Sequence, residues 1–171
     1  MNIEVVPINC RLSERSLRDI LEFVNAGMRK FPISFKLMPH HRTLKYVATC
    51  ELMPYIAGNF PRPAIAVVSR SIEKAEYSRF TMGIADDEQQ VALVKSEPGY
   101  VGRLRNEGLA QTIIHEYLHL LGQNHHRRST FTPDGLYCPF MHYGAAELTS
   151  LEPCIPCSEK IQKYLEQRRA A

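Results

Sequence analysis

The chain has 171 residues, which is enough for one domain with a buried hydrophobic core. Hydrophobic residues make up 44% and charged residues 23% of the chain, an ordinary globular composition that excludes extensive disorder. The net charge is +3 and the sequence pI is about 8.6. Because the basic pairs 127–128 and 168–169 stand alone, we expect no nucleic-acid partner.

The N-terminal stretch, residues 1–15, includes Glu4 and has no long apolar run, so it does not resemble a signal peptide. No segment approaches the length of about eighteen uninterrupted apolar residues that a membrane span requires. We therefore expect a cytoplasmic monomer without a membrane partner. In that compartment the five cysteines stay reduced or bind metal, and their odd number also argues against a complete disulfide framework.

The first predicted element is a strand over 3–8, I-E-V-V-P-I, which should stop near Pro7. A helix is expected next, capped by Ser13 and ending near Gly27. Its apolar residues at helical spacing are Leu17, Ile20, Leu21 and Val24.

A second strand is expected at 33–38, where polar and apolar residues alternate. The segment 40–63 is ambiguous, because three prolines and a glycine break it into loops. Three further strands are expected at 64–69, 80–85 and 90–95.

A long helix should run from about Leu104 to Leu121, and a last helix should cover 158–169. Between them lies a turn-rich segment that carries cysteines. The expected order is β-α-β-β-β-β-α followed by an irregular C-terminal lobe that starts at Gly122. This order predicts an α/β or α+β domain with a mixed sheet.

The segment 112–126, T-I-I-H-E-Y-L-H-L-L-G-Q-N-H-H, contains a dense histidine cluster. His115 and His119 are four residues apart, so on a helix they share one face and can direct two ring nitrogens at a single ion. Glu116 lies about 100° round the helix and would flank that ion. This is the H-E-x-x-H arrangement, in which the glutamate activates a zinc-bound water.

Gly122 extends the motif, because glycine readily adopts the left-handed conformation that turns a chain at a helix end. His125 can then supply a third nitrogen, which completes H-E-x-x-H-x-x-G-x-x-H. The alternative is a set of surface or satisfied core histidines, and the eleven-residue string disfavours it. Three protein ligands leave the fourth zinc position for water, as in catalytic sites. With Glu116 taking and returning the proton, the expected reaction is peptide-bond hydrolysis.

Followed by C-P-F-M-H-Y-G (138–144), this motif resembles that of the metzincin metalloproteases, and more narrowly that of the archaemetzincins. The resemblance implies an α+β metzincin fold for a single domain, residues 1–171. This fold has a mixed twisted sheet, two long helices and a small irregular, zinc-bound C-terminal subdomain that ends in a helix. The active-site cleft would lie between an upper subdomain, about 1–122, and a lower subdomain, about 123–171.

The resemblance also implies roles for single positions. Met141 would lie beneath the metal as a packing base, and residues 80–85 would form the edge strand that pairs with an extended peptide substrate. Tyr143 either ligates the zinc or packs and hydrogen-bonds near it.

Archaemetzincins are described as holding a second, structural zinc through cysteines near the methionine and a C-x-x-C pair. This sequence keeps Cys138, Cys154 and Cys157. However, His126 replaces the first cysteine, the spacer 127–137 is longer, and Cys138 stands one residue further from the methionine. Histidine also binds zinc, so these four residues would form a Cys3His site. Alternatively, the second site is lost and the C-x-x-C is a loop pair.

The sequence therefore predicts a zinc-dependent metallopeptidase that acts on a peptide or protein substrate. One catalytic zinc would be held by His115, His119 and His125, with Glu116 as general acid/base, and a second zinc would be structural. The alternative is a non-catalytic zinc-binding or peptide-interaction module on the same scaffold. The glutamate argues against this alternative, because a purely structural site gains little from it.

Overall fold

A computed structural model of the whole chain describes residues 1–42, 49–69, 83–96, 103–124, 138 and 151–170. Its described elements are β1 (Asn2–Ile8), α1 (Glu14–Gly27), β2 (Ser34–Leu37), α2 (Thr49–Asn59), β3 (Ala64–Val68), β4 (Gly83–Asp86), β5 (Val91–Lys95), α3 (Arg103–Leu120) and α4 (Ile155–Ala170). None of these described helices is long and apolar enough to span a lipid bilayer.

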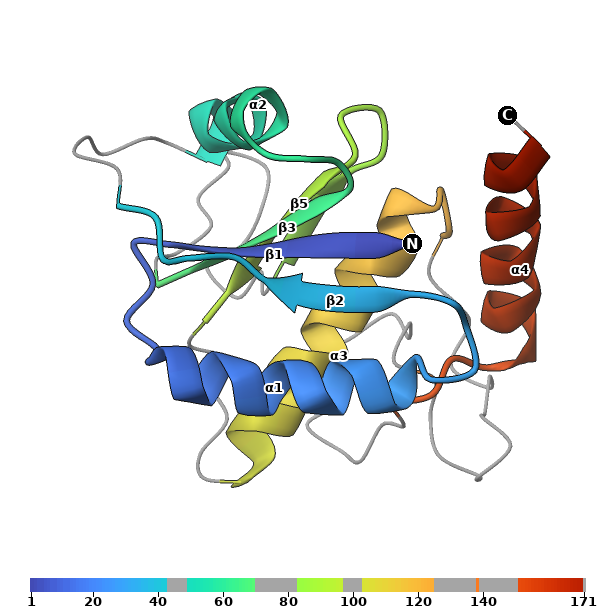
Figure 1. Cartoon of the computed structure of the whole chain (residues 1–171), viewed down its shortest axis with the longest axis horizontal. Coiled ribbons are helices and arrows are strands. Elements are labelled where there is room, and N and C mark those ends of the chain that lie inside the picture. The colour runs from blue at the N-terminus through green and yellow to red at the C-terminus, as the bar shows by residue number, and fades with distance from the viewer. Residues whose placement is uncertain (43–48, 70–82, 97–102, 125–137, 139–150, 171) are drawn as a thin grey trace.

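The strands form one mixed sheet in the order β2-β1-β3-β5-β4 (Figure 1). All neighbours are parallel except β4, which runs antiparallel to β5 at the edge of the described sheet. The mixed sheet predicted from the sequence is therefore confirmed. β1 continues through Pro7 because β2 pairs with it only as far as Val5. The missing N–H of Pro7 lies past the end of β2, so no hydrogen bond between those strands is lost.

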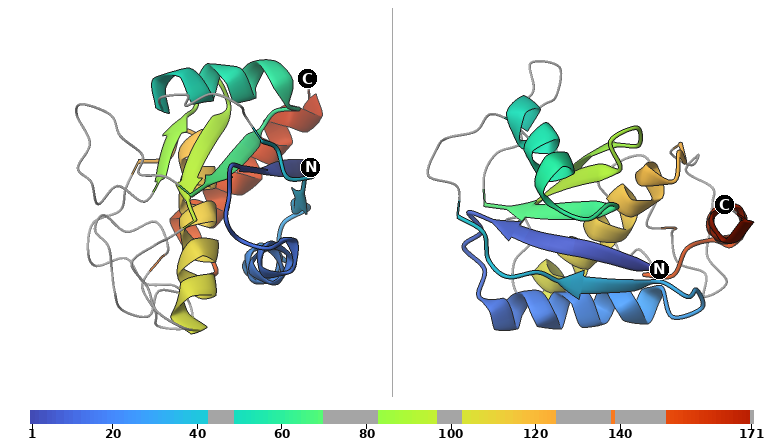
Figure 2. Two further views of the ribbon diagram at one scale, coloured as in Figure 1. Left: turned by 90° about the vertical axis from the view of Figure 1, so that its left-hand side faces the viewer. Right: turned by 45° about the horizontal axis from the view of Figure 1, so that its top comes forward.

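Helices cover both faces of the sheet. α1 and α3 lie on one face and α2 on the other (Figure 2). Successive strand residues point to opposite faces, so Val5 packs with α1 and α3 whereas Val6 packs on the α2 side. A strand buried on both faces must be apolar throughout, which explains the uninterrupted A-I-A-V-V of β3.

Helix α2 corrects the expectation of loops over 40–63. It includes Pro54, which removes one backbone hydrogen bond at a cost of about 3 kcal/mol. Its residues Leu52, Met53 and Ile56 are buried against the sheet. Burying three such side chains contributes about 1.5–3 kcal/mol each and outweighs the proline.

Of the predicted strand 80–85, positions 80–82 lie outside the described residues.

The first helix, α1, and the last helix, α4, pack on the same core. Ser13 caps α1 as predicted, and its Oγ accepts a hydrogen bond from the backbone N–H of Ser16 (3.1 Å). A Cβ added to Gly27 would lie 2.9 Å from Cβ of Leu151, so the segment before α4 passes directly against the end of α1. Buried Cys157, Ile161 and Leu165 of α4 belong to the same hydrophobic cluster as α1 and α3.

Candidate active site

The C-terminal end of α3 turns as the motif predicts. Gly122 has φ +69°, in the left-handed region that favours glycine. Its N–H donates to the carbonyl of His119 (2.8 Å), and the N–H of Gln123 donates to the carbonyl of Leu118 (3.2 Å). This pair of bonds is a Schellman motif, which ends the helix and satisfies two of its last carbonyls. The proposed third ligand, His125, lies outside the described residues.

His115 and His119 lie together on α3, with ring centroids 5.0 Å apart and planes at 71°. Nδ1 of His119 donates to the backbone carbonyl of Gln123 (3.0 Å), because a carbonyl can only accept. This tautomer puts the ring lone pair on Nε2, the nitrogen that a metal would bind. Burial lowers the pKa of His119, opposed by the Gln123 bond and by the Asp87 carboxylate, so the neutral form that ligation requires is favoured.

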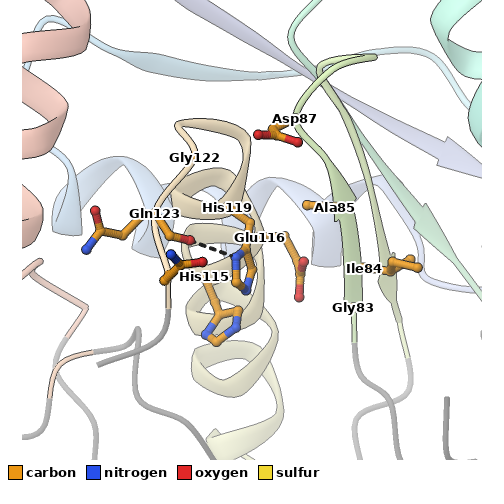
Figure 3. A pocket seen from close by; sticks show the side chains of 10 residues that line it. Gly83, Ile84, Ala85, Asp87, His115, Glu116, His119, Gly122 and Gln123 are labelled. Carbon is orange, nitrogen blue, oxygen red and sulfur yellow. Dashed lines mark hydrogen bonds between the residues drawn. The ribbon is translucent and has the colours of Figure 1, made fainter. Parts of the chain in front are cut away.

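Glu116 points from α3 toward β4 and is only 4% exposed (Figure 3). Burial raises the pKa of this carboxyl to about 8. Its Oε2 is buried and finds no hydrogen-bond partner in the described part of the chain. A buried carboxylate oxygen of this kind requires a water or a cation beside it, because leaving it unpaired is costly.

Gly83 of β4 makes room for the carboxylate. A Cβ at this position would lie 2.6 Å from Cγ and Cδ of Glu116, and closer still to Oε1. Any side chain here would therefore displace the carboxylate. The first residue of β4 thus sets how near the glutamate lies to the strand.

A cavity of about 360 Å³ opens between β4 and the end of α3 (Figure 3). It is lined by Gly83, Ile84, Ala85, Asp87, His115, Glu116, His119, Gly122, Gln123 and Asn124. The donor set fits a zinc ion: two imidazoles share one helix face and a buried carboxylate lies beside them. The predicted methionine Met141 and Tyr143 lie outside the described residues.

The structure brings together Cys138, Cys154 and Cys157, although up to nineteen residues separate them in sequence. All three are buried, and their sulfurs lie within 4.8 Å of one another, with Cys138 Sγ and Cys157 Sγ 3.9 Å apart. Two thiolates on a tetrahedral zinc with Zn–S bonds of about 2.3 Å would be about 3.8 Å apart. The proposed fourth ligand, His126, lies outside the described residues.

The electrostatics of this cluster also fit a metal. Hydrogen bonds to Cys138 and Cys154, followed by burial, raise the pKa of the Cys157 thiol. The Cys157 thiol therefore favours its protonated form without a cation, whereas a bound zinc would replace thiol protons and bind thiolates.

Sequence reasoning missed Gly83 and Asp87, which line the cavity, and Gln90, whose side chain binds the Asp87 carbonyl. Gly83 falls in the predicted strand 80–85, and a glycine inside a strand pattern can signal close approach of another group, here Glu116. Asp87 lies between the predicted strands 80–85 and 90–95, and Gln90 belongs to the second of them, where no role was predicted for either residue. The contacts of these residues come from other elements, which a sequence pattern does not show.

No protein-family model and no curated protein matches this sequence. Its structure, however, is similar to solved structures. Archaemetzincin from Methanopyrus kandleri gives a TM-score of 0.69 over 97% of this chain and 96% of that chain, at 18% identity. Archaemetzincin from Archaeoglobus fulgidus, crystallised with malonate, gives 0.67 over 94% and 99%, also at 18% identity.

A third structure, a zinc-dependent peptidase from Methanocorpusculum labreanum, gives a TM-score of 0.67 over 93% of this chain and 99% of that chain, at 15% identity. At such identities the likeness establishes the fold. The expected resemblance to archaemetzincins is therefore confirmed as a likeness of fold, and the chemistry has to be argued from the residues of this chain.

Proposed function

We propose that the protein is a zinc-dependent metallopeptidase of the metzincin type, with Glu116 as general acid/base and His115, His119 and His125 as the zinc ligands. The observation that carries this proposal is the placement of a buried carboxylate beside two imidazoles in one cavity. A surface cluster of histidines would not bury a glutamate next to it, because an unpaired buried carboxylate is destabilising.

Zinc, when bound, would polarise a water molecule, lower its pKa toward neutrality and stabilise negative charge on the scissile carbonyl oxygen. Glu116 would accept the proton of the attacking water and then deliver it to the leaving amine. Burial raises the pKa of this carboxyl and so favours the form that holds the proton, whereas a bound cation would favour the carboxylate that accepts it. His119 keeps its ring orientation through the bond to Gln123, and Gly83 lets the glutamate lie against β4.

The substrate is proposed to be an extended peptide paired with β4. This strand forms the edge of the described sheet and lines the cavity through Gly83, Ile84 and Ala85. A strand with one unpaired edge can form main-chain hydrogen bonds with a peptide laid along it. Such a peptide would pass in front of Glu116, which lies against the first residue of β4.

A second, structural zinc is proposed at Cys138, Cys154 and Cys157, with His126 as the fourth ligand. The convergence of three buried sulfurs supports it. The site would join Cys138 to the start of α4. The continuous cluster shared by α1, α3 and α4 supports a single domain, with upper and lower parts divided near residue 122.

The test is Glu116→Gln in the zinc-loaded protein, with a mixed peptide library as substrate. The variant should keep its zinc, because the glutamate is not a proposed ligand, and should lose about 10²–10⁴-fold in cleavage rate. Glu107→Gln is the matched control on the same helix, outside the cavity, and should cleave like the unchanged protein.

Undiminished cleavage by the Glu116 variant would overturn the assigned role. If the zinc-loaded unchanged protein bound peptides but cleaved none, the non-catalytic binding module would be the better description.

A further inference from the structure

Gln90, the last residue of the turn between β4 and β5, makes four hydrogen bonds. Its backbone carbonyl accepts from the N–H of Ala64 (3.1 Å). Its side-chain Nε2 donates to the carbonyls of Asp87 and Leu120 (2.7 Å each). Its Oε1 accepts from the hydroxyl of Tyr164 (3.1 Å). One half-buried side chain thus connects the β4–β5 turn, the end of α3 and the middle of α4, while its backbone holds β3.

The backbone of Gln90 does not favour glutamine. Its φ is +56°, a conformation that costs a non-glycine residue about 1–2 kcal/mol and that glycine adopts readily. Only a side chain with an amide at this reach makes the bonds to Leu120 and Tyr164 together. The three side-chain bonds offset the backbone cost. We call the connection that they make between the turn, α3 and α4 the Gln90 junction, and the offset indicates that the junction requires this residue.

The junction lies between the two walls of the cleft, which are the end of α3 and the Asp87 side of the sheet. Leu120 directly follows His119, and Asp87 lines the cavity from the side of the sheet. The Nε2 of Gln90 therefore holds the last turn of α3 and the Asp87 end of the cavity at a fixed separation. We propose that Gln90 is a positioning residue that sets the spacing of these two walls and makes it depend on α4 through Tyr164. The inference rests on the proposed peptidase function only for its kinetic consequence.

Helix α4 is well suited to hold one end of this junction. Tyr164 is half-buried, and the Arg168 guanidinium lies over its ring, 5.5 Å from the centroid. Cys157, two turns earlier, belongs to the buried cysteine cluster. Ile161 before Tyr164 and Leu165 after it are buried in the core, so the hydroxyl that reaches Gln90 is carried by a helix held on both sides of it.

Substrate binding and chemistry should respond differently to loss of the junction. Glu116 lies against Gly83, at the opposite end of β4 from the turn, so its position does not depend on Gln90. The Asp87 wall and Leu120 at the end of α3 do depend on it, whereas His119 keeps its own bond to the Gln123 carbonyl. Loss of the junction should therefore raise KM more than it lowers kcat.

The experiment compares three variants of the full-length, zinc-loaded chain. Gln90→Glu keeps the acceptor for Tyr164 but loses both amide donations, and Tyr164→Phe removes only the bond from α4. Gln89→Ala is the matched control, because Gln89 lies in the same turn and its side chain donates to Asp86 rather than to α3 or α4. Amide hydrogen exchange is measured over 87–90 and 119–123, together with KM and kcat.

Each lost hydrogen bond should speed exchange in these two segments by about fivefold. KM should rise by about fivefold in Tyr164→Phe, which loses one bond, and by more in Gln90→Glu, which loses two. Gln89→Ala should leave both quantities near those of the unchanged protein.

The proposal is overturned if neither Gln90→Glu nor Tyr164→Phe changes exchange in the two segments. It is also overturned if exchange rises throughout the chain while kcat falls at constant KM, because that pattern marks general destabilisation. If the unchanged protein cleaves no peptide, the proposed function fails, and the exchange data alone then decide whether Gln90 sets the spacing of the walls.

Discussion

In the metal-free protein, replacing Glu116 by glutamine should raise the free energy of unfolding by an amount that depends on pH. The carboxyl is buried, and Oε2 has no hydrogen-bond partner among the described residues. Ionising it in place is therefore unfavourable, whereas glutamine has nearly the same shape and does not ionise.

The size of the effect follows from the pKa, which burial raises from 4.5 to about 8. At about 1.4 kcal/mol per pH unit, the ionised form is disfavoured by up to about 5 kcal/mol in the folded chain. Below pH 4.5 the group is protonated in both the folded and the unfolded states, so it does not alter stability. Stability then falls as pH rises, by about 3 kcal/mol at pH 7, and levels off above the folded pKa of about 8.

The assay is urea unfolding of both chelator-treated proteins from pH 5 to pH 8.5. The same unfolding series is then repeated after zinc has been restored. Both proteins are stripped of metal in the same way, so any loss of stability at the cysteine cluster is the same in both and cancels in the comparison. Glu107→Gln reports the general effect of this replacement on α3. The free energy of unfolding of the Glu116 variant should increasingly exceed that of the unchanged protein as pH rises. Zinc should reduce this difference, because a cation stabilises the carboxylate. Equal stability at every pH without metal would refute the account of Glu116 as a buried, unpartnered carboxyl.

Three further predictions concern the cavity and the cysteine cluster. Gly83→Ala should displace the Glu116 carboxylate and lower kcat by about 10²-fold with zinc retained, whereas unchanged kcat would show that the contact is not needed. Gly122→Ala should cost about 1–2 kcal/mol in denaturant unfolding, because alanine is strained at φ +69°, and no loss would mean that the helix end readjusts. Cys154→Ser should lower the zinc content by about one ion per chain and reduce thermal stability, with Cys10→Ser as the control; an unchanged zinc count would remove the structural site.

Much of the fold could be predicted because hydrophobic periodicity is local. The apolar spacing and the Ser13 cap predicted α1, and the apolar runs predicted the strands to within a few residues. Helix α2 could not be predicted in this way. Pro54 and the flanking glycine and prolines indicate loops, and only the packing of Leu52 and Ile56 against the sheet makes the helix stable.

The candidate site, too, could be predicted only in part from the sequence. The spacing of His115 and His119 and the turn at Gly122 were determined by the sequence alone, because positions four apart share a helix face and glycine permits a positive φ. Only the tertiary structure decided that Glu116 lies against Gly83 and that Cys138 meets the cysteines at the start of α4. The same holds for the junction at Gln90. Such contacts depend on how β4, α3 and α4 pack against one another, and packing between distant segments leaves no fixed spacing in the sequence.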